Sequence, residues 1–149
     1  MIKALRVFSL GIVTLVLIAY FPAQAARTIT VNKKQVVTGK VYELSSLMDD
    51  LTSLDEFYTI VESHTVFIDF YATWCPPCKT MVPRFKDLAQ EADHVLFIKI
   101  NLDEFRFIGQ AYGVKSLPTF ISFKNGQEVA FIAKGTISKK QLKSLSGVC

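Results

Sequence analysis

Two cysteines separated by two prolines, Cys75-Pro76-Pro77-Cys78, are the feature that most limits the possible folds of this chain. The run before them, VFIDFY at 66–71, is apolar and rich in β-forming residues, which predicts a strand buried on both faces. After them, apolar residues recur at the spacing of one helical face, which predicts a helix over 76–91. The cysteine pair therefore lies where a buried strand passes into a helix, an arrangement found in α/β proteins.

Cysteines in this position suit dithiol chemistry. The start of a helix leaves unpaired N–H groups and the positive end of the helix dipole beside the first sulfur, and both stabilise a thiolate. We expect Cys75 to be the accessible nucleophile and Cys78 the more buried resolving thiol. A static structural disulfide and half of a zinc site are the alternatives. Zinc needs four ligands, and only Cys149 and two scattered histidines remain to supply them.

Two charged residues stand inside runs that are otherwise apolar. Asp69 lies within 66–71, and Lys99 lies within a second predicted buried strand, VLFIKI at 95–100. A buried carboxylate is costly unless it has a partner or a task, so Lys99 is the candidate partner of Asp69. A buried carboxylate with a raised pKa can also take the proton of the resolving thiol. A purely structural ion pair is the alternative.

The remaining elements complete an α/β chain. Asn125-Gly126 lies between two predicted strands and marks a hairpin. Two helices begin with capping-box sequences, Ser53 with Glu56 and Ser138 with Gln141. The order of elements predicts a three-layer α/β/α sandwich around a mixed sheet. Besides the strands and the helix described above, the sequence predicts helices over 55–62, 104–112 and 138–145 and strands over 119–123 and 128–133.

The first 25 residues contribute much of a mean hydropathy of +0.31, which is high for a soluble domain. Lys3 and Arg6 precede an uncharged stretch over 7–26, and Ala23-Gln24-Ala25 supplies the small residues of a cleavage site. This arrangement predicts a secretory signal peptide over 1–25. An uncleaved anchor is the alternative, and it would be the protein's only contact with the membrane. Either predicts an exported protein, and the lack of an Asn-x-Ser/Thr sequon is consistent with a bacterial periplasm.

Residues 26–149 read as one domain, with 26–50 as an N-terminal extension of one or two short strands. Hydrophobic residues make up 50% of the chain, which excludes disordered and collagen-like proteins. The net charge of +4 is spread singly or in pairs, so no nucleic-acid surface is indicated. Three cysteines are too few for a disulfide scaffold. No cofactor or metal is expected.

The run D-F-Y-A-T-W-C-P-P-C-K from Asp69 to Lys79, with Pro83 after it, resembles the thioredoxin family. Further matching segments follow in the family's order over about residues 54–145: K-I-N-L-D at 99–103, Y-G-V-K-S-L-P-T at 112–119, F-K-N-G at 123–126 and K-G at 134–135. The resemblance implies the thioredoxin fold and thiol–disulfide exchange with protein substrates.

The resemblance also implies a role for each matching residue. Cys75 and Cys78 correspond to the redox pair, and Asp69 and Lys99 to a buried proton-transfer pair. Pro118 corresponds to a cis-proline that faces the disulfide and offers backbone hydrogen bonds to substrate. The apolar groove around the site would be formed by Trp74, Gly113, Leu117 and Gly135.

The sequence departs from the family at Pro76, where the cytosolic reductants carry glycine. Proline lacks the N–H that would stabilise the Cys75 thiolate, which argues for a reducing couple. We therefore expect a monomeric, exported protein-disulfide reductase that a membrane electron carrier recharges. The resemblance implies that its clients would be apocytochromes awaiting haem, disulfide isomerases or oxidised structural thiols. The alternatives are a disulfide-donating oxidant or isomerase, and a non-catalytic binding module of the same fold.

Three further residues carry weaker signals. Cys149 is the last residue and is expected to be an incidental free thiol, with an intermolecular disulfide or a glutathione adduct as alternatives. His64 and His94 flank predicted strands, where solvated surface positions are expected.

Overall fold

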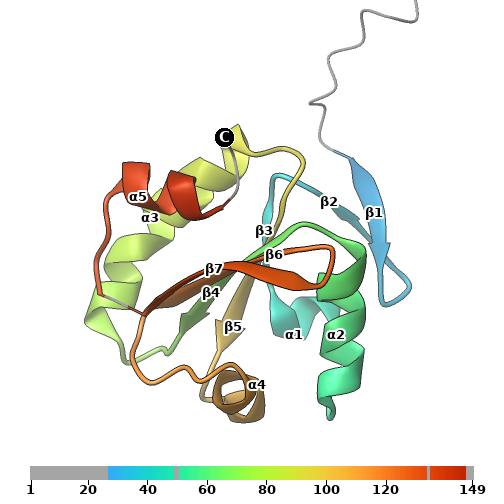
Figure 1. Cartoon of the computed structure of the whole chain (residues 1–149), viewed down its shortest axis with the longest axis horizontal. Helices are drawn as coiled ribbons and strands as arrows, with labels where there is room; N and C mark the ends of the chain where they lie inside the picture. The colour runs from blue at the N-terminus through green and yellow to red at the C-terminus, as the bar shows by residue number, and fades with distance from the viewer. Residues whose placement is uncertain (1–26, 49–50, 134, 147–149) are drawn as a thin grey trace, which may run out of the picture.

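A five-stranded mixed sheet forms the centre of the molecule (Figure 1). In this computed structural model, residues 27–48, 51–133 and 135–146 are described. The strands lie in the order β3-β5-β4-β6-β7. The first three are parallel to one another, and β6 and β7 are antiparallel to their neighbours. Their bounds are β3 Val41–Glu43, β4 Val66–Tyr71, β5 Leu96–Asn101, β6 Thr119–Lys124 and β7 Gln127–Ala133.

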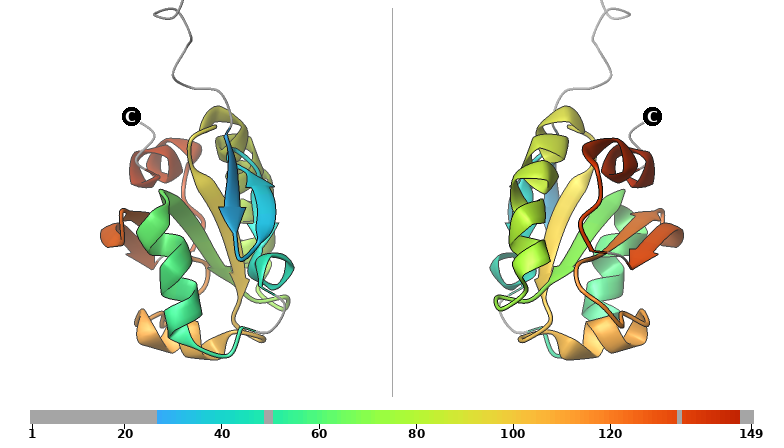
Figure 2. Two further views of the ribbon diagram at one scale, coloured as in Figure 1. Left: turned by 90° about the vertical axis from the view of Figure 1, so that its right-hand side faces the viewer. Right: turned by 90° about the vertical axis from the view of Figure 1, so that its left-hand side faces the viewer.

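Helices cover both faces of this sheet, as predicted for a three-layer sandwich. Figure 2 shows α3 (Pro76–Glu91) and α5 (Lys139–Leu145) on one side, with α2 (Leu54–Ser63) on the other. Helices α1 (Leu44–Leu47) and α4 (Arg106–Ala111) add residues to the core on the side of α2. The fold class predicted from the sequence is confirmed.

Strands β4 and β5 lie in the middle of the sheet and are buried on both faces, as their apolar sequences predict. Phe67 of β4 points to the α3 side, where its ring stacks on Phe85 with centroids 5.5 Å apart. Ile68, the next residue, belongs to the core on the opposite side. Asp69 alternates back to the side of Phe67 and therefore lies beneath α3.

The two predicted capping boxes have different outcomes. Ser138 and Gln141 form the full box at the start of α5. Ser53 is the N-cap of α2, but its side chain makes no capping hydrogen bond, so the box predicted with Glu56 is wrong. Asp55 and Glu56 instead place two carboxylates in the first turn, where they interact favourably with the positive end of the helix dipole.

The hairpin predicted at Asn125-Gly126 joins β6 to β7. Both residues have positive φ, 51° and 78°, which is the backbone that an Asn-Gly turn supplies. The Gly126 N–H donates to the carbonyl of Val61 at 3.0 Å, so the turn is attached to α2. A Cβ at Gly126 would lie 3.2 Å from Cγ of Glu62, which favours glycine here.

The segment before residue 50 contains three short strands, one more than the sequence predicts. Strands β1 (Thr28–Val31) and β2 (Lys34–Val37) form a separate hairpin, which covers the core with Val31 and Val36. Strand β3 instead joins the main sheet beside β5. The end of this segment is therefore part of the central domain.

Within the described ranges, no helix is both long enough and apolar enough to cross a membrane. The predicted signal peptide or anchor, 1–25, lies outside the described residues.

Candidate active site

The two cysteines occupy the turn between β4 and the first turn of α3. Cys75 is the N-cap of α3, and the prolines fill the first two helical positions. Proline suits the start of a helix because its φ is already helical and its missing N–H would have no partner inside the helix. The Cys75 N–H donates to the carbonyl of Ala72 at 3.2 Å, which closes the turn.

Cys75 and Cys78 form a disulfide, with their Cα atoms 5.3 Å apart. The N–H of Cys78 donates to Sγ of Cys75 at 3.2 Å. Because Pro76 and Pro77 have no N–H, Cys78 is the first residue of α3 that can donate to this sulfur. One helix N–H is therefore directed at the atom that would carry the thiolate charge.

The cysteines differ in the cavities that they line rather than in their exposure. Cys75 is 3% exposed and Cys78 is 2% exposed, so the disulfide form does not show the expected contrast in accessibility. Cys75 lines an open cavity of about 460 Å³ together with Trp74, Arg106 and Leu117. Cys78 lines a separate cavity of about 240 Å³. A substrate in the larger cavity would meet Cys75.

Trp74 is held at the rim of the larger cavity by Asp103. The indole is 69% exposed, and its Nε1 donates to Oδ1 of Asp103 at 3.0 Å. The hydroxyl of Thr73 donates to the other carboxylate oxygen at 3.3 Å. An exposed aromatic side chain with a fixed orientation offers contact area at low entropic cost.

The Leu117–Pro118 peptide bond is cis, which is the conformation that the family resemblance implies. Pro118 is buried, while Leu117 packs against the disulfide and lines the larger cavity. Gly113 and Gly135, also expected in the groove, are exposed and do not line that cavity. The roles of these residues in substrate binding stay predictions.

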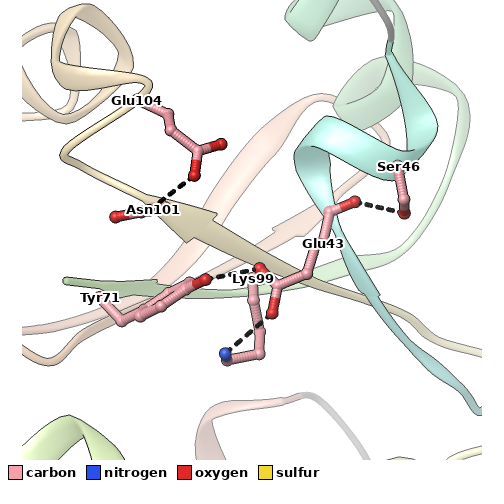
Figure 3. Close-up of polar contacts among 6 residues, drawn as sticks. All are labelled: Glu43, Ser46, Tyr71, Lys99, Asn101 and Glu104. Carbon is pink, nitrogen blue, oxygen red and sulfur yellow. Dashed lines mark hydrogen bonds and ion pairs between the residues drawn. The ribbon is translucent and has the colours of Figure 1, made fainter. Parts of the chain in front are cut away.

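Lys99 binds Glu43 and does not form the hydrogen-bonded pair expected with Asp69. Its Nζ lies 3.0 Å from Oε1 of Glu43, a residue of β3 that the sequence analysis did not consider (Figure 3). The hydroxyl of Tyr71 donates to Oε2 of Glu43 at 2.9 Å. Neither carboxylate oxygen of Asp69 has a hydrogen-bond partner in the described part of the chain. Lys99 reaches the better hydrated carboxylate, as long basic side chains commonly do.

Burial raises the pKa of Asp69 from 3.8 to about 7. The positive charge of Lys99 opposes this rise, and the negative charge of Glu43 adds to it. Asp69 can therefore gain or lose a proton near neutral pH, which suits a general acid or base. Burial and the hydrogen bond to Glu43 raise the pKa of Tyr71, so its hydroxyl keeps its proton and remains a donor.

Comparison with known proteins identifies the family. The thioredoxin family model matches residues 50–146, which include both cysteines, Asp69, Lys99 and Pro118. The chain belongs to the thioredoxin family. It is accordingly an enzyme, a thioredoxin-type thiol–disulfide oxidoreductase.

Individual thioredoxins agree with this assignment. The thioredoxin of Chlamydia pneumoniae is 40% identical over 98 residues, which cover 66% of this chain and 95% of that protein. Mitochondrial thioredoxin 3 of Saccharomyces cerevisiae, in its oxidised form, is 38% identical, with a TM-score of 0.58 over 63% of this chain and 88% of that chain. Thioredoxin of Schistosoma mansoni is 32% identical, with a TM-score of 0.60 over 71% of this chain and 92% of that chain.

Two residues near the site of this thioredoxin were missed by the sequence analysis. Asp103 stands in the K-I-N-L-D segment, just after β5, and its place near the end of a buried strand was an available signal. Glu43 lies outside the residues that the family model matches. Nothing in the local sequence pairs it with Lys99, because the two residues are 56 positions apart.

The other predicted polar residues lie apart from this site. His64 is half-buried, and His94 is exposed, with Nδ1 lying 3.6 Å from a carboxylate oxygen of Asp93. Over the described ranges, no group of three or more His, Cys, Asp or Glu side chains is placed to bind a metal. Cys149 lies outside those ranges.

Proposed function

We propose that this chain is an exported protein-disulfide reductase that works through the Cys-Pro-Pro-Cys dithiol. The observation that carries the proposal is the position of Cys75. Its sulfur accepts the first available N–H of α3 at 3.2 Å, and the residue lines the open cavity of about 460 Å³. An activated sulfur at the floor of an open groove fits a nucleophile that receives a polypeptide substrate.

In the first step, the Cys75 thiolate of the reduced protein attacks one sulfur of a substrate disulfide. A bond forms between Sγ of Cys75 and that sulfur, and the substrate S–S bond breaks. The other substrate sulfur leaves as a thiolate and takes a proton from solvent. The product is a mixed disulfide between enzyme and substrate.

In the second step, Cys78 resolves the mixed disulfide. Asp69, ionised above a pKa of about 7, accepts the thiol proton of Cys78. The resulting thiolate attacks Sγ of Cys75, and the bond between that sulfur and the substrate breaks. The second substrate sulfur leaves as a thiolate and takes a proton from solvent, and Asp69 returns its proton to solvent. The substrate has gained two electrons and two protons, and the enzyme holds the Cys75–Cys78 disulfide.

Geometry supports the placing of Asp69 beneath α3. Phe67 packs on Phe85 of the helix, and Cys78 stands seven residues before Phe85, about 10 Å along the helix axis. Asp69 stands two residues after Phe67, about 7 Å along β4. In a crossover between parallel strands, the helix runs antiparallel to the strand before it. The step from Phe85 to Cys78 along α3 and the step from Phe67 to Asp69 along β4 therefore lead toward the same end of the sheet. Asp69 therefore lies under the first turns of α3.

Two features bear on the direction of electron flow. The missing N–H groups of Pro76 and Pro77 leave the Cys75 thiolate with fewer donors, which favours a reducing couple. The remaining N–H of Cys78 stabilises the thiolate and favours the second candidate, an oxidant that donates its disulfide to exported chains. We assign the reductase because Pro76 removes a donor that glycine supplies at this position in the cytosolic reductants.

Export and partners follow from the predicted leader over 1–25. A reductant in an oxidising compartment must be recharged, so the proposal includes a membrane carrier that passes electrons outward. The substrates proposed are apocytochromes awaiting haem, disulfide isomerases and oxidised structural thiols.

The redox potential of the Cys75–Cys78 couple, measured against glutathione, tests the direction. The reductase proposal predicts a potential well below that of the glutathione couple. A potential well above it would identify the protein as an oxidant. Reduction of insulin by the wild type and by Cys75→Ser tests whether the chain is a catalyst, because a binding module would show no turnover that depends on Cys75.

A further inference from the structure

We propose that Glu43 is a positioning residue for Asp69: it binds Lys99 and so keeps the lysine's charge from pairing with the buried carboxyl. The inference rests on the proposed role of Asp69 as proton acceptor. It concerns a residue of β3, which lies before the part of the chain that the family model matches.

The three residues form one row across three adjacent strands. Glu43 of β3 is the register partner of Lys99 of β5, and Lys99 is the register partner of Asp69 of β4. Neighbouring strands lie about 4.8 Å apart, so Lys99 stands between two carboxylates at similar backbone distances. The positions in the sheet alone therefore allow Lys99 to pair with either one.

The side-chain contacts select Glu43. Its carboxylate accepts from Nζ of Lys99 at 3.0 Å and from the Tyr71 hydroxyl at 2.9 Å (Figure 3). The ammonium group of Lys99 also lies 3.7 Å from the centre of the Tyr71 ring, a cation–π contact. Tyr71 therefore contacts both partners of the ion pair and orients it.

Solvation explains the choice. The side chain of Glu43 is 43% exposed and that of Lys99 is 11% exposed, whereas Asp69 is fully buried. An ion pair with Asp69 would need to remove two charges from water, and that cost commonly exceeds the attraction gained. Pairing with Glu43 leaves one partner partly hydrated, so Asp69 is left without a hydrogen bond to its carboxylate oxygens in the described chain.

The charges near Asp69 then have opposing effects. On β5 and β3, Lys99 lowers the pKa of Asp69 and Glu43 raises it. The other groups that face Asp69 carry no charge. They are the phenol of Tyr71 on β4, the register partner Phe120 on β6, and the Cys78 thiol of the reduced protein on α3. Neutralising Glu43 removes one negative charge and also frees Lys99 to approach Asp69. Both changes act in the same direction.

The smaller cavity gives Lys99 the space for this movement. A partly open cavity of about 240 Å³ lies beside Cys78, and both Tyr71 and Lys99 line it. This open space beside the Lys99 side chain leaves room for its head group to move away from Glu43.

The test is Glu43→Gln in the full chain, with the Asp69 carboxyl titrated by carbon NMR of the reduced protein. We expect the midpoint to fall by about one pH unit, the size of change that a charge partner produces. The pH profile of the rate of mixed-disulfide resolution should shift by the same amount. In the Asp69→Asn background, Glu43→Gln should no longer shift this profile. Glu91→Gln is the matched control. Glu91 is an exposed glutamate outside this row, and its Oε1 lies 2.6 Å from Nζ of Lys139.

An unchanged or raised midpoint in Glu43→Gln would overturn the proposal. If that variant does not fold, Glu43→Met removes the same charge with a side chain of similar length and is judged by the same titration. A lowered midpoint with an unmoved profile would support the effect of Glu43 on Asp69 and would count against Asp69 as proton acceptor. The two claims are therefore tested separately.

Discussion

Nζ of Lys99 lies 3.0 Å from Oε1 of Glu43. Lys99 is on the strand next to Asp69, and Glu43 is one strand further away. The buried carboxyl that stands under the cysteine helix is thus left without a hydrogen-bonded counterion in the described structure. Its elevated pKa follows from this arrangement, since burial is only partly opposed by a lysine engaged elsewhere.

Single substitution of the cysteines should separate the two steps of the reaction. Cys75→Ser removes the attacking sulfur, so insulin reduction should fall to the uncatalysed rate. Cys78→Ser retains attack but prevents resolution, so mixed disulfides with protein substrates should accumulate on non-reducing gels and be released by dithiothreitol. Cys149→Ser is the control and should keep wild-type turnover. Equal activity in Cys75→Ser would contradict the assigned nucleophile.

Asp69→Asn should stabilise the protein above neutral pH. The folded protein holds the Asp69 proton up to about pH 7, whereas the unfolded chain releases it near pH 3.8, so stability is lost as pH rises between these values. The neutral amide avoids this loss. We expect a gain of about 2–4 kcal/mol in the free energy of unfolding at pH 8, and almost none at pH 3.5.

Urea unfolding at the two pH values measures this difference. Asp87→Asn, an exposed carboxylate on α3, is the control and should show no comparable change with pH. A gain of equal size at both pH values would show that packing, and not titration, is responsible.

Asp103→Asn should weaken substrate binding by loosening Trp74. The change leaves a neutral acceptor for Nε1 in place of the carboxylate that now lies 3.0 Å away. Replacing a partly exposed, charge-assisted hydrogen bond with a neutral one costs about 1 kcal/mol, which corresponds to a rise of roughly fivefold in KM. Tryptophan fluorescence anisotropy should fall in parallel. Glu56→Gln, at an exposed carboxylate of α2 that does not line the larger cavity, should change neither quantity.

Pro76→Gly should make the couple more oxidising. Glycine restores an N–H at the first position of α3, where it can approach Sγ of Cys75. One added donor to the thiolate stabilises the reduced form by about 1.4 kcal/mol, which corresponds to roughly 30 mV in the redox potential. Equilibration with glutathione measures the shift. Pro83→Ala, in the interior of the same helix, is the control and should leave the potential near the wild-type value.

The predicted leader has its own test. Expression of the full chain with its native N-terminus in a bacterial host should yield a periplasmic protein that begins at Ala26, as read by mass spectrometry of the intact protein. A full-length product in the membrane fraction would instead indicate the uncleaved anchor.

Much of the active site could be predicted from local sequence. The apolar run over 66–71, the prolines at the helix start and the spacing of the two cysteines specify β4, α3 and the disulfide between them. These features depend on residues close together in the chain, where periodicity and helix-start chemistry act directly. The Asn125-Gly126 turn was predictable for the same reason.

The partner of Lys99 was decided only by the tertiary structure. Local sequence placed Lys99 and Asp69 in buried strands, and it contained no information on which strand would lie on the far side of β5. That neighbour is β3, whose Glu43 is 56 residues from Lys99 along the chain. Strand pairing over such separations depends on packing of the whole sheet, and relative hydration then decides which carboxylate binds the lysine.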